Sequence, residues 1–543
     1  MCAPPRFSRG IDAPRVCVMP SLSYFLCFIF VCVLCVCGRA SLCLSCARRR
    51  VRHPRSFRMQ VAGGRPALGT SFRHAELPLN TRNGTGVGKK PDEINYAEFW
   101  RSAWAQAKEA VDTMSTQTKH GRRIRWPKVY IYELPASLNE SFRPDLTSVQ
   151  DVFGPPLQQW SDAGFRKSVH RTQSWWARVN ASRRAVLSKH VRDTNHYGFT
   201  KAFLYRLWHS SRYRTLDPAA ADLFLVPVFP LPKRGGKINS ACDGTTSDEI
   251  AKALPHLDRT NAHKHLLVLA KEQYEGYRCK GWWADPKGLF KRMMRLSYSV
   301  QQPERVRPDL LYYGKAGLPP DCHSPVSELG CPSYPNGADV PYLSNVHWPL
   351  EADGAALGDE SGPPWADSTP RQVTMLFLGS ATHGDIKVRK HISGMCHRYR
   401  DPTTCTLMRY DLFTLLLKSA AHFCLEPAGD SPWRRSITDS VAFGCIPVFF
   451  SGAQDAAYDW LWGGWRRAAS VSINRTMFLS NRISLRKLLG SVPPELLALY
   501  KRTIAAHGRK FTVSLSDDPG DAVHSLLHGA VEASAQNARL NGW

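Results

Sequence analysis

Acidic side chains are scarce in this sequence of 543 residues, where 45 Asp and Glu stand against 72 Lys and Arg and give a formal net charge of +27. About half of the excess lies in residues 1–125, which contain 21 Lys and Arg and 7 Asp and Glu. A basic folded part suits anionic ligands such as nucleotide diphosphates or acidic glycans, although solvated surface cations give the same balance. Recognition-helix and aromatic RNA-binding patterns are missing, which argues against nucleic acid as a partner.

Internal repeats and acidic metal motifs are also missing. No repeat of solenoid or propeller period is present, which excludes those architectures. The folded part has no Asp-x-Asp motif at a strand end, so nothing in the sequence indicates a metal site.

The sixteen cysteines form two groups of eight, one within the first 46 residues and one much further along the chain. Six members of the first group, from Cys27 to Cys46, lie in or beside an apolar run and have no His at zinc spacing, so they fit small hydrophobic residues or acylation sites. In the second group, the pairs Cys322/Cys331 and Cys396/Cys405 each bracket a short loop. We expect local disulfides at these pairs if the compartment is oxidising.

One long apolar run is present, residues 22–37, with sixteen residues and no charge. It predicts a membrane signal-anchor segment after a tail of residues 1–21, with a cleaved signal peptide as the alternative. Basic residues flank the run on both sides, so charge does not set its orientation. Residues 38–125, much of which is rich in Arg, Gly, Ser and Pro, predict a largely flexible stem.

Beyond the stem, short apolar runs alternate with longer amphipathic stretches, which is typical of an α/β fold with largely parallel sheets. The predicted strands are short runs of β-branched, aromatic and leucine residues at 129–132, 223–229, 266–269, 373–378 and 446–450. Residues 351–370, rich in Gly, Asp, Ala and Pro, predict a linker. The linker separates two predicted domains, residues 126–350 and residues 371–543 with the terminal helices.

Residues 423–450, FCLEPAGDSPWRRSITDSVAFGCIPVFF, have the pattern strand, loop, helix, strand. Gly429 permits a sharp loop, and Ser431 followed by proline predicts a helix start. Gly444 predicts the left-handed end of the same helix.

The start of this helix has the chemistry of an anion site. Unpaired N–H groups there lie beside Arg434 and Arg435, and together these groups favour a diphosphate. An ordinary surface helix with an Arg435–Asp439 ion pair is the alternative.

The same stretch resembles the signature of exostosin-like glycosyltransferases, glycosyltransferase family 47, in which a Gly-Asp-Ser loop, arginines, an acidic residue and Gly-Cys-Ile-Pro-Val follow in this order. Its adjacent arginines and closing PVFF are especially similar to the xyloglucan galactosyltransferase branch. Between residues 128 and 462, KVYIYELP, DPAAADLFLVPVF, DVPY and TMLFLGSATHGDIKVR also resemble family segments, in the family's order. The family's Gly-Arg-Asp-His segment is altered to RTNAHKHLLVL, where Asn261 and His265 remain.

The resemblance implies a GT-B fold, in which two Rossmann-like domains face each other across a cleft and the second holds the nucleotide sugar. It also implies inversion, in which a base deprotonates the acceptor hydroxyl while the nucleoside diphosphate leaves from the opposite face. GT-B enzymes generally neutralise this leaving group with helix N-termini and basic side chains, so we expect neither a metal nor a cofactor.

The resemblance also selects candidate site residues. The donor-binding candidates are Gly379, Arg389, Gly429, Asp430, Ser431, Arg434, Arg435 and Asp439. The arginines are expected to neutralise the diphosphate, and the glycines to allow close approach of the backbone. Asp439 either accepts the ribose hydroxyls or orients Arg435. His265 is the candidate catalytic base, with a hydrogen-bonded structural histidine as the alternative.

The expected function is transfer of a sugar, with galactose favoured, from a UDP-sugar to an oligosaccharide or polysaccharide acceptor. The altered segment motivates an alternative, a non-catalytic member that binds glycan or supports a partner transferase, and a complex with other glycosyltransferases is also expected. The expected place is the Golgi membrane, with a single pass and a luminal catalytic part. Sequons at Asn83, Asn139, Asn180 and Asn474 fit a luminal glycoprotein.

Overall fold

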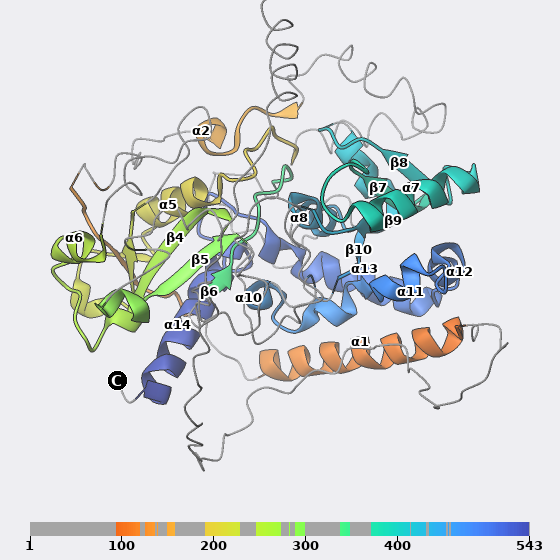
Figure 1. The fold of residues 1–543 in the computed structure, drawn as a ribbon. Helices are drawn as coiled ribbons and strands as arrows, with labels where there is room; N and C mark the ends of the chain where they lie inside the picture. The colour runs from red at the N-terminus through yellow and green to blue at the C-terminus, as the bar shows by residue number, and fades with distance from the viewer. Residues whose placement is uncertain are drawn as a thin grey trace, which may run out of the picture. The chain divides into compact units, whose positions relative to one another are not determined.

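The structure, a computed structural model, describes residues 94–119, 125–135, 138, 149–157, 190–228, 246–272, 282, 288–298, 337–347, 371–412, 414–429, 434–451, 454 and 458–541, all within one compact unit, Arg73–Trp543. Two β-sheets come from separate parts of this unit, and helices accompany both (Figure 1). The fold is mixed α/β with two parallel sheets, as predicted, and it fits a GT-B-like architecture. The predicted membrane segment, residues 22–37, and linker, residues 351–370, lie outside the described residues.

The first sheet has six strands in the order β2-β1-β3-β4-β5-β6, and every neighbouring pair is parallel. In that order the strands are Arg214–Thr215, Val129–Ile131, Leu223–Val226, His265–Glu272, Met294–Tyr298 and Gly337–Asp339. Parallel sheets are covered on both faces, so their strands are continuous apolar runs. The sequence LFLV of β3 is buried at every position for this reason.

The second sheet has five strands in the order β11-β10-β9-β7-β8, again with every neighbouring pair parallel. In that order the strands are Val471–Ser472, Ile446–Phe449, Ala421–Glu426, Val373–Leu378 and Cys405–Met408. The chain moves from β7 outward to β8 and then returns to the other side of β7 at β9. The strand order therefore reverses between β7 and β9.

The α-helices connect and flank the two sheets. They are α1 Tyr96–Lys119, α2 Val149–Phe153, α5 Phe199–His209, α6 Ser247–Lys252, α7 Ile386–Tyr399, α8 Arg435–Ala442, α10 Asp459–Trp462, α11 Arg475–Leu479, α12 Leu485–Gly490, α13 Pro494–His507 and α14 Ala522–Asn541. Local sequence sets several of their ends. Asp385 accepts a hydrogen bond from the Val388 N–H at the start of α7, and Gly444, with φ +66°, follows α8 as predicted.

All five strands predicted from apolar runs are present, as β1, β3, β4, β7 and β10, and the strand predicted at the start of residues 423–450 is present as β9. The other five strands of the described residues, β2, β5, β6, β8 and β11, were not predicted. Two of them, β2 and β11, have only two residues each, and β6 has the sequence GAD. Such segments have too little β-branched or aromatic content to be identified by pattern.

The helix α1 corrects the predicted extent of the stem. It occupies Tyr96–Lys119 within residues 38–125, and Trp100 is only 2% exposed. The Trp100 Nε1–H donates to the Leu488 carbonyl at 3.0 Å. The folded part therefore includes α1, while the predicted stem before residue 94 lies outside the described residues. Across the described ranges, no helix is both long and apolar enough to cross a membrane.

The C-terminal segment packs against elements that accompany the first sheet, and not only against those of the second. Arg206 of α5, 1% exposed, donates to Asp521 Oδ2 at 2.9 Å and to Asp517 Oδ1 at 3.1 Å. The Tyr213 hydroxyl lies 2.7 Å from His524 Nδ1. The sequence alone placed all of residues 371–543 in the second domain, but these contacts join residues 517–524 to the first.

We predict that Arg206→Ala lowers the free energy of unfolding by about 3–5 kcal/mol, because Asp521 is left as a buried carboxylate without its cation. Thermal unfolding monitored by circular dichroism measures this loss. Arg259→Ala is the matched control, since Arg259 is exposed. Equal unfolding temperatures for the two variants would show that the buried ion pair does not hold the C-terminal segment in place.

Candidate functional site

The candidate site lies at the carboxyl edge of the second sheet, where the strand order reverses. The loops that follow β7 and β9, of which the structure describes residues 379–385, 427–429 and 434, leave the sheet at this point. In open parallel α/β sheets, ligands bind outside the carboxyl ends of the strands at such a switch point. By sequence, five of the donor-binding candidates fall within these two loops, from Gly379 to Arg434, and Arg389 follows on α7.

Arg389 fastens the two loops together. Its side chain is 3% exposed, and it donates from Nε to the Ala428 carbonyl at 3.0 Å, from Nη2 to the Pro427 carbonyl at 3.0 Å and from Nη1 to the Ser380 carbonyl at 2.9 Å. The Asp385 N–H also donates to the Ala428 carbonyl, at 3.1 Å. Every nitrogen of the Arg389 guanidinium binds backbone, so this geometry favours loop positioning over direct contact with a diphosphate.

Three glycines allow the loops to approach so closely. Gly384 has φ +71°, and a Cβ there would lie 2.5 Å from the Gly429 Cα. A Cβ on Gly429 would overlap the Arg434 guanidinium, and a Cβ on Gly379 would lie 3.1 Å from Arg389 Nη1. Gly379 and Gly429, which were chosen from the sequence, thus each make room for an arginine.

The helix start differs from its prediction. The sequence pointed to Ser431 as N-cap, but α8 begins at Arg435 with Arg434 as N-cap, in extended conformation at φ −151° and ψ 150°. Arg434 is half-buried over Gly429, and among the described residues its guanidinium has no hydrogen-bonding or ion-pair partner. Asp430 and Ser431 lie outside the described residues. The later start leaves Arg434 as an available cation at the helix N-terminus.

Arg435 has a different environment from its neighbour. Its Nη1 donates to the Thr194 carbonyl at 2.7 Å and to Asn345 Oδ1 at 3.3 Å. Its guanidinium carbon lies 5.4 Å from the centre of the Tyr410 ring. Arg435 therefore connects α8 to segments that accompany the first sheet, and its cation is already paired with oxygen acceptors.

Asp439 lies fully buried in the middle of α8. Its carboxylate accepts hydrogen bonds from Ser344 Oγ at 2.7 Å, from the Asn345 N–H at 3.0 Å and from Tyr410 Oη at 3.1 Å. Burial raises the pKa of Asp439, while the charges of Arg435 and Lys418 act in the opposite direction. Because Asp439 has no exposed surface, it fits the predicted role of orienting Arg435 better than the predicted contact with the ribose hydroxyls.

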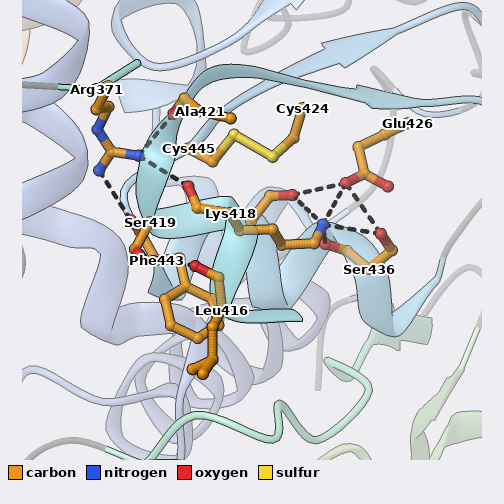
Figure 2. The surroundings of a disulfide bond; sticks show 11 residues. Arg371, Leu416, Lys418, Ser419, Ala421, Cys424, Glu426, Ser436, Phe443 and Cys445 are labelled. Carbon is orange, nitrogen blue, oxygen red and sulfur yellow. Dashed lines mark hydrogen bonds and ion pairs between the residues drawn. A yellow bond between two sulfur atoms is a disulfide. The ribbon is translucent and has the colours of Figure 1, made fainter. Parts of the chain in front are cut away.

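A buried charge pair beneath α8 could not be identified from sequence spacing. Lys418, on the 3₁₀ helix η11 (Thr414–Ala420), donates to Glu426 Oε1 at 2.8 Å, to the Ser436 carbonyl at 2.8 Å and to Ser440 Oγ at 2.6 Å. Glu426 Oε1 also accepts from the hydroxyls of Ser436 and Ser440. Figure 2 shows the Lys418 ammonium between Glu426 and Ser436. This network attaches the first turns of α8 to the end of β9.

Two disulfides stabilise the second sheet. Cys396–Cys405 joins α7 to β8 and confirms the prediction for that pair, while Cys322 and Cys331 lie outside the described residues. Cys424–Cys445, 21 residues apart, joins β9 to the residue before β10 and is drawn in Figure 2. Both of its cysteines flank α8, so the bond closes the strand–helix–strand unit that contains Arg434.

The structure places His265 in the core. It is 0% exposed at the amino end of β4, its Nδ1 donates to the Asn261 carbonyl at 3.0 Å, and its Nε2 lies 2.8 Å from Tyr132 Oη. Burial lowers its pKa to about 4, and its ring stacks on Phe224. These surroundings fit the structural alternative better than the catalytic base, because ligands of parallel sheets bind at the carboxyl edge.

The described ranges contain no group of three or more His, Cys, Asp or Glu side chains placed to hold a metal ion. The groups that the structure does bring together at the switch point are a helix N-terminus, the loop glycines and Arg434. This arrangement is typical of α/β proteins that bind the phosphates of nucleotides.

The model of the exostosin GT47 domain matches residues 125–488 of this chain. The chain therefore belongs to the exostosin GT47 family and is a glycosyl-transfer enzyme, with a nucleotide-sugar donor and a glycan acceptor.

Three relatives show the breadth of the family. A "Probable glucuronosyltransferase" of Oryza sativa subsp. japonica is 23% identical over 367 residues, 63% of this chain and 76% of that protein. A "Probable beta-1,4-xylosyltransferase" of Arabidopsis thaliana is 23% identical over 363 residues, 63% of this chain and 77% of that protein. A "Probable xyloglucan galactosyltransferase" of the same plant is 39% identical over 85 residues, 15% of this chain and 18% of that protein. A chain from the solved structure of a GtfA/B complex aligns with 51% of this chain and 56% of its own length, at 11% identity and a TM-score of 0.20, which has no bearing on the fold.

We predict that Arg434→Ala lowers turnover by about 10²-fold or more, because a preorganised cation is lost at the leaving group, while the unfolding temperature stays unchanged. We expect Arg435→Ala to lower both turnover and unfolding temperature, since it removes the bonds to Thr194 and Asn345. Steady-state kinetics and thermal unfolding separate the two outcomes. Arg398→Ala, an exposed arginine on α7, is the control. Wild-type turnover in Arg434→Ala would remove the donor-site assignment.

We also predict that Lys418→Met destabilises the protein by about 3–5 kcal/mol, because Glu426 remains buried without its cation. In the double variant Lys418→Met/Glu426→Gln, neither member of the pair is charged and the hydroxyls of Ser436 and Ser440 retain an acceptor, so much of the stability should return. Unfolding free energies of Lys418→Met, Glu426→Gln, the double variant and the wild type test this. Additive losses in the double variant would contradict a coupled pair.

Proposed function

We propose that the chain is an inverting glycosyltransferase that moves a sugar, with galactose favoured, from a UDP-sugar to a glycan acceptor. The observation that carries this proposal is Arg434, which is half-buried over Gly429 at the N-terminus of α8 and has no partner among the described residues. The other cations near it, Arg389 and Arg435, are bound to oxygen acceptors of the protein. A diphosphate placed at the loops after β7 and β9 would meet Arg434 and the amides of the helix start.

The proposed reaction places developing negative charge at this position. The acceptor hydroxyl attacks the anomeric carbon, the bond from that carbon to the UDP oxygen breaks, and the hydroxyl proton passes to a base on the opposite face. Arg434 and the α8 N-terminus stabilise the diphosphate as it gains charge. Arg389 and the Lys418–Glu426 pair contribute by holding the loops and the helix in place. The base is not His265, because that side chain is buried and bonded on both ring nitrogens.

Galactose is favoured as the donor sugar by two similarities. One is the segment GDSPWRRSITDSVAFGCIPVFF, which resembles the xyloglucan galactosyltransferase branch. The other is the 39% identity over 85 residues to a protein named as such a galactosyltransferase. Relatives named for transfer of xylose and glucuronic acid define the competing donors.

A donor screen on the full-length chain tests this proposal. UDP-galactose, UDP-glucuronate and UDP-xylose are each incubated with the wild type and with Arg434→Ala, and release of UDP is measured. We expect UDP-galactose to be turned over fastest by the wild type and at least about 10²-fold more slowly by the variant. A faster reaction with another UDP-sugar would overturn the galactose assignment alone. No UDP release from any donor would support the non-catalytic alternative and overturn the enzyme proposal.

We also propose that residues 22–37 anchor the chain in the Golgi membrane, with the catalytic part in the lumen and in contact with other glycosyltransferases. The apolar run supports the anchor, and the sequon at Asn474 supports the luminal side. Asn474 is exposed, and its Oδ1 caps α11 by accepting from the Met477 N–H at 3.1 Å. The cap does not use Nδ2, which is the atom that N-glycosylation modifies.

We predict that the expressed protein carries N-glycan and that residues 125–541 resist protease in sealed microsomes. Asn474→Asp removes the sequon but keeps an oxygen cap on α11, so it should lower the apparent mass without lowering the unfolding temperature. Gel mobility before and after glycosidase treatment measures the first effect. Digestion of the folded part in sealed vesicles would place it in the cytosol and overturn the luminal proposal.

A further inference from the structure

A groove with a volume of about 1200 Å³ lies between α1 and the region of α12 and the start of α13. Its lining residues come from positions 96–104 and 484–495, and none of them belongs to the loops after β7 and β9. The α1 side also precedes residue 125, where the match to the family model begins. The groove is larger than the pockets of about 300–1,000 Å³ that enclose single small ligands. It therefore has room for an extended chain.

Aromatic side chains form one wall of the groove. Tyr96, Trp100 and Trp104 are spaced four residues apart and therefore share one face of α1. The Tyr96 hydroxyl accepts from the Ser484 N–H at 3.0 Å, and the Trp100 Nε1–H donates to the Leu488 carbonyl, so these two side chains attach the helix. Trp104 has no such anchoring bond among the described contacts and is 36% exposed. Its indole offers a flat apolar surface, which suits the C–H face of a pyranose.

The charged residues of the groove are mostly basic. Arg101, Arg486 and Lys487 line it, and Glu495 is the single carboxylate among the lining residues. Arg101 and Arg486 are both exposed, and the Arg486 guanidinium carbon lies 5.7 Å from the centre of the Tyr399 ring. Guanidinium groups beside an aromatic surface favour a ligand that combines carboxylates with apolar faces.

We propose that this groove binds an acidic glycan, a chain of pyranoses that bear carboxylates, with a sugar ring stacked on Trp104 and carboxylates paired with Arg101 and Arg486. The preceding segment of the same chain is a less suitable occupant, because it is basic like the groove. Residues 38–93 contain twelve Lys and Arg against three Asp and Glu. The groove shares no residue with the donor loops, so the proposal goes beyond donor turnover and can be tested separately from it.

Isothermal titration calorimetry of the full-length chain tests the proposal. The probes are an oligogalacturonate, a neutral xylo-oligosaccharide of the same length and a single-stranded oligonucleotide. The groove variants are Trp104→Ala and the double variant Arg101→Ala/Arg486→Ala. Their matched controls are Leu216→Ala, at an apolar residue 78% exposed, and Arg259→Ala, at an exposed arginine outside the groove.

We expect the wild type to bind the oligogalacturonate more tightly than the neutral chain, with an affinity that falls as salt is raised. Each groove variant should weaken this binding by about tenfold or more, while both controls bind as the wild type does and UDP-sugar hydrolysis is unchanged in all variants. Equal binding of the acidic and neutral chains, or wild-type binding by the groove variants, would overturn the proposal. Tighter binding of the oligonucleotide, lost in the same variants, would assign the groove to nucleic acid instead.

Discussion

The Asp439 carboxylate sets the position of α8, because it lies fully buried in the middle of that helix and must have its hydrogen-bond donors there. Its donors are Ser344, Asn345 and Tyr410, which come from the segment after β6 and the segment after β8. A rotation of α8 would leave this carboxylate buried and unpaired, which costs several kcal/mol. The helix is therefore held in one orientation relative to both segments.

The same orientation explains why two adjacent arginines have different roles. Arg435, the first residue of α8, is directed to the Thr194 carbonyl and Asn345. Arg434, one residue earlier and in extended conformation, lies over Gly429 at the loop. The buried carboxylate thus fixes an orientation in which Arg435 is bound to the protein, while Arg434 has no partner among the described residues.

The Lys418–Glu426 pair and the Cys424–Cys445 disulfide support this arrangement from the sheet side (Figure 2). The pair attaches the first turns of α8 to the end of β9, and the disulfide joins the strands on either side of the helix. Arg389 then fixes the loop after β7 against the loop after β9. Buried polar groups with every partner present give such a site its rigidity.

Local features of the site were predictable from sequence, and long-range ones were not. The loop at Gly429, the helix end at Gly444 and the strands beside them depend on neighbouring residues, so their spacing was informative. Two partners of Asp439, Asn345 and Ser344, lie 94 and 95 residues away, and the third, Tyr410, lies 29 residues away, so no spacing rule identifies them. The helix start was misplaced for a related reason, since the Ser-Pro signal is local whereas Lys418 fixes Ser436 from another element.

His265 and α1 show the same limit in other parts of the chain. The burial of His265 depends on Tyr132, 133 residues away, and α1 packs on Leu488, 388 residues from Trp100. The structural role of His265 and the presence of α1 in the folded part depend on these long-range contacts, which the local sequence does not indicate.

We propose that Arg434 and the start of α8 receive the donor diphosphate at the switch point of the second sheet. A crystal structure of the chain with UDP tests it most directly. We expect a diphosphate oxygen within hydrogen-bonding distance of the Arg434 guanidinium, above Gly429 and between the loops that follow β7 and β9. A diphosphate bound at the carboxyl edge of the first sheet, with Arg434 turned to solvent, would contradict the account.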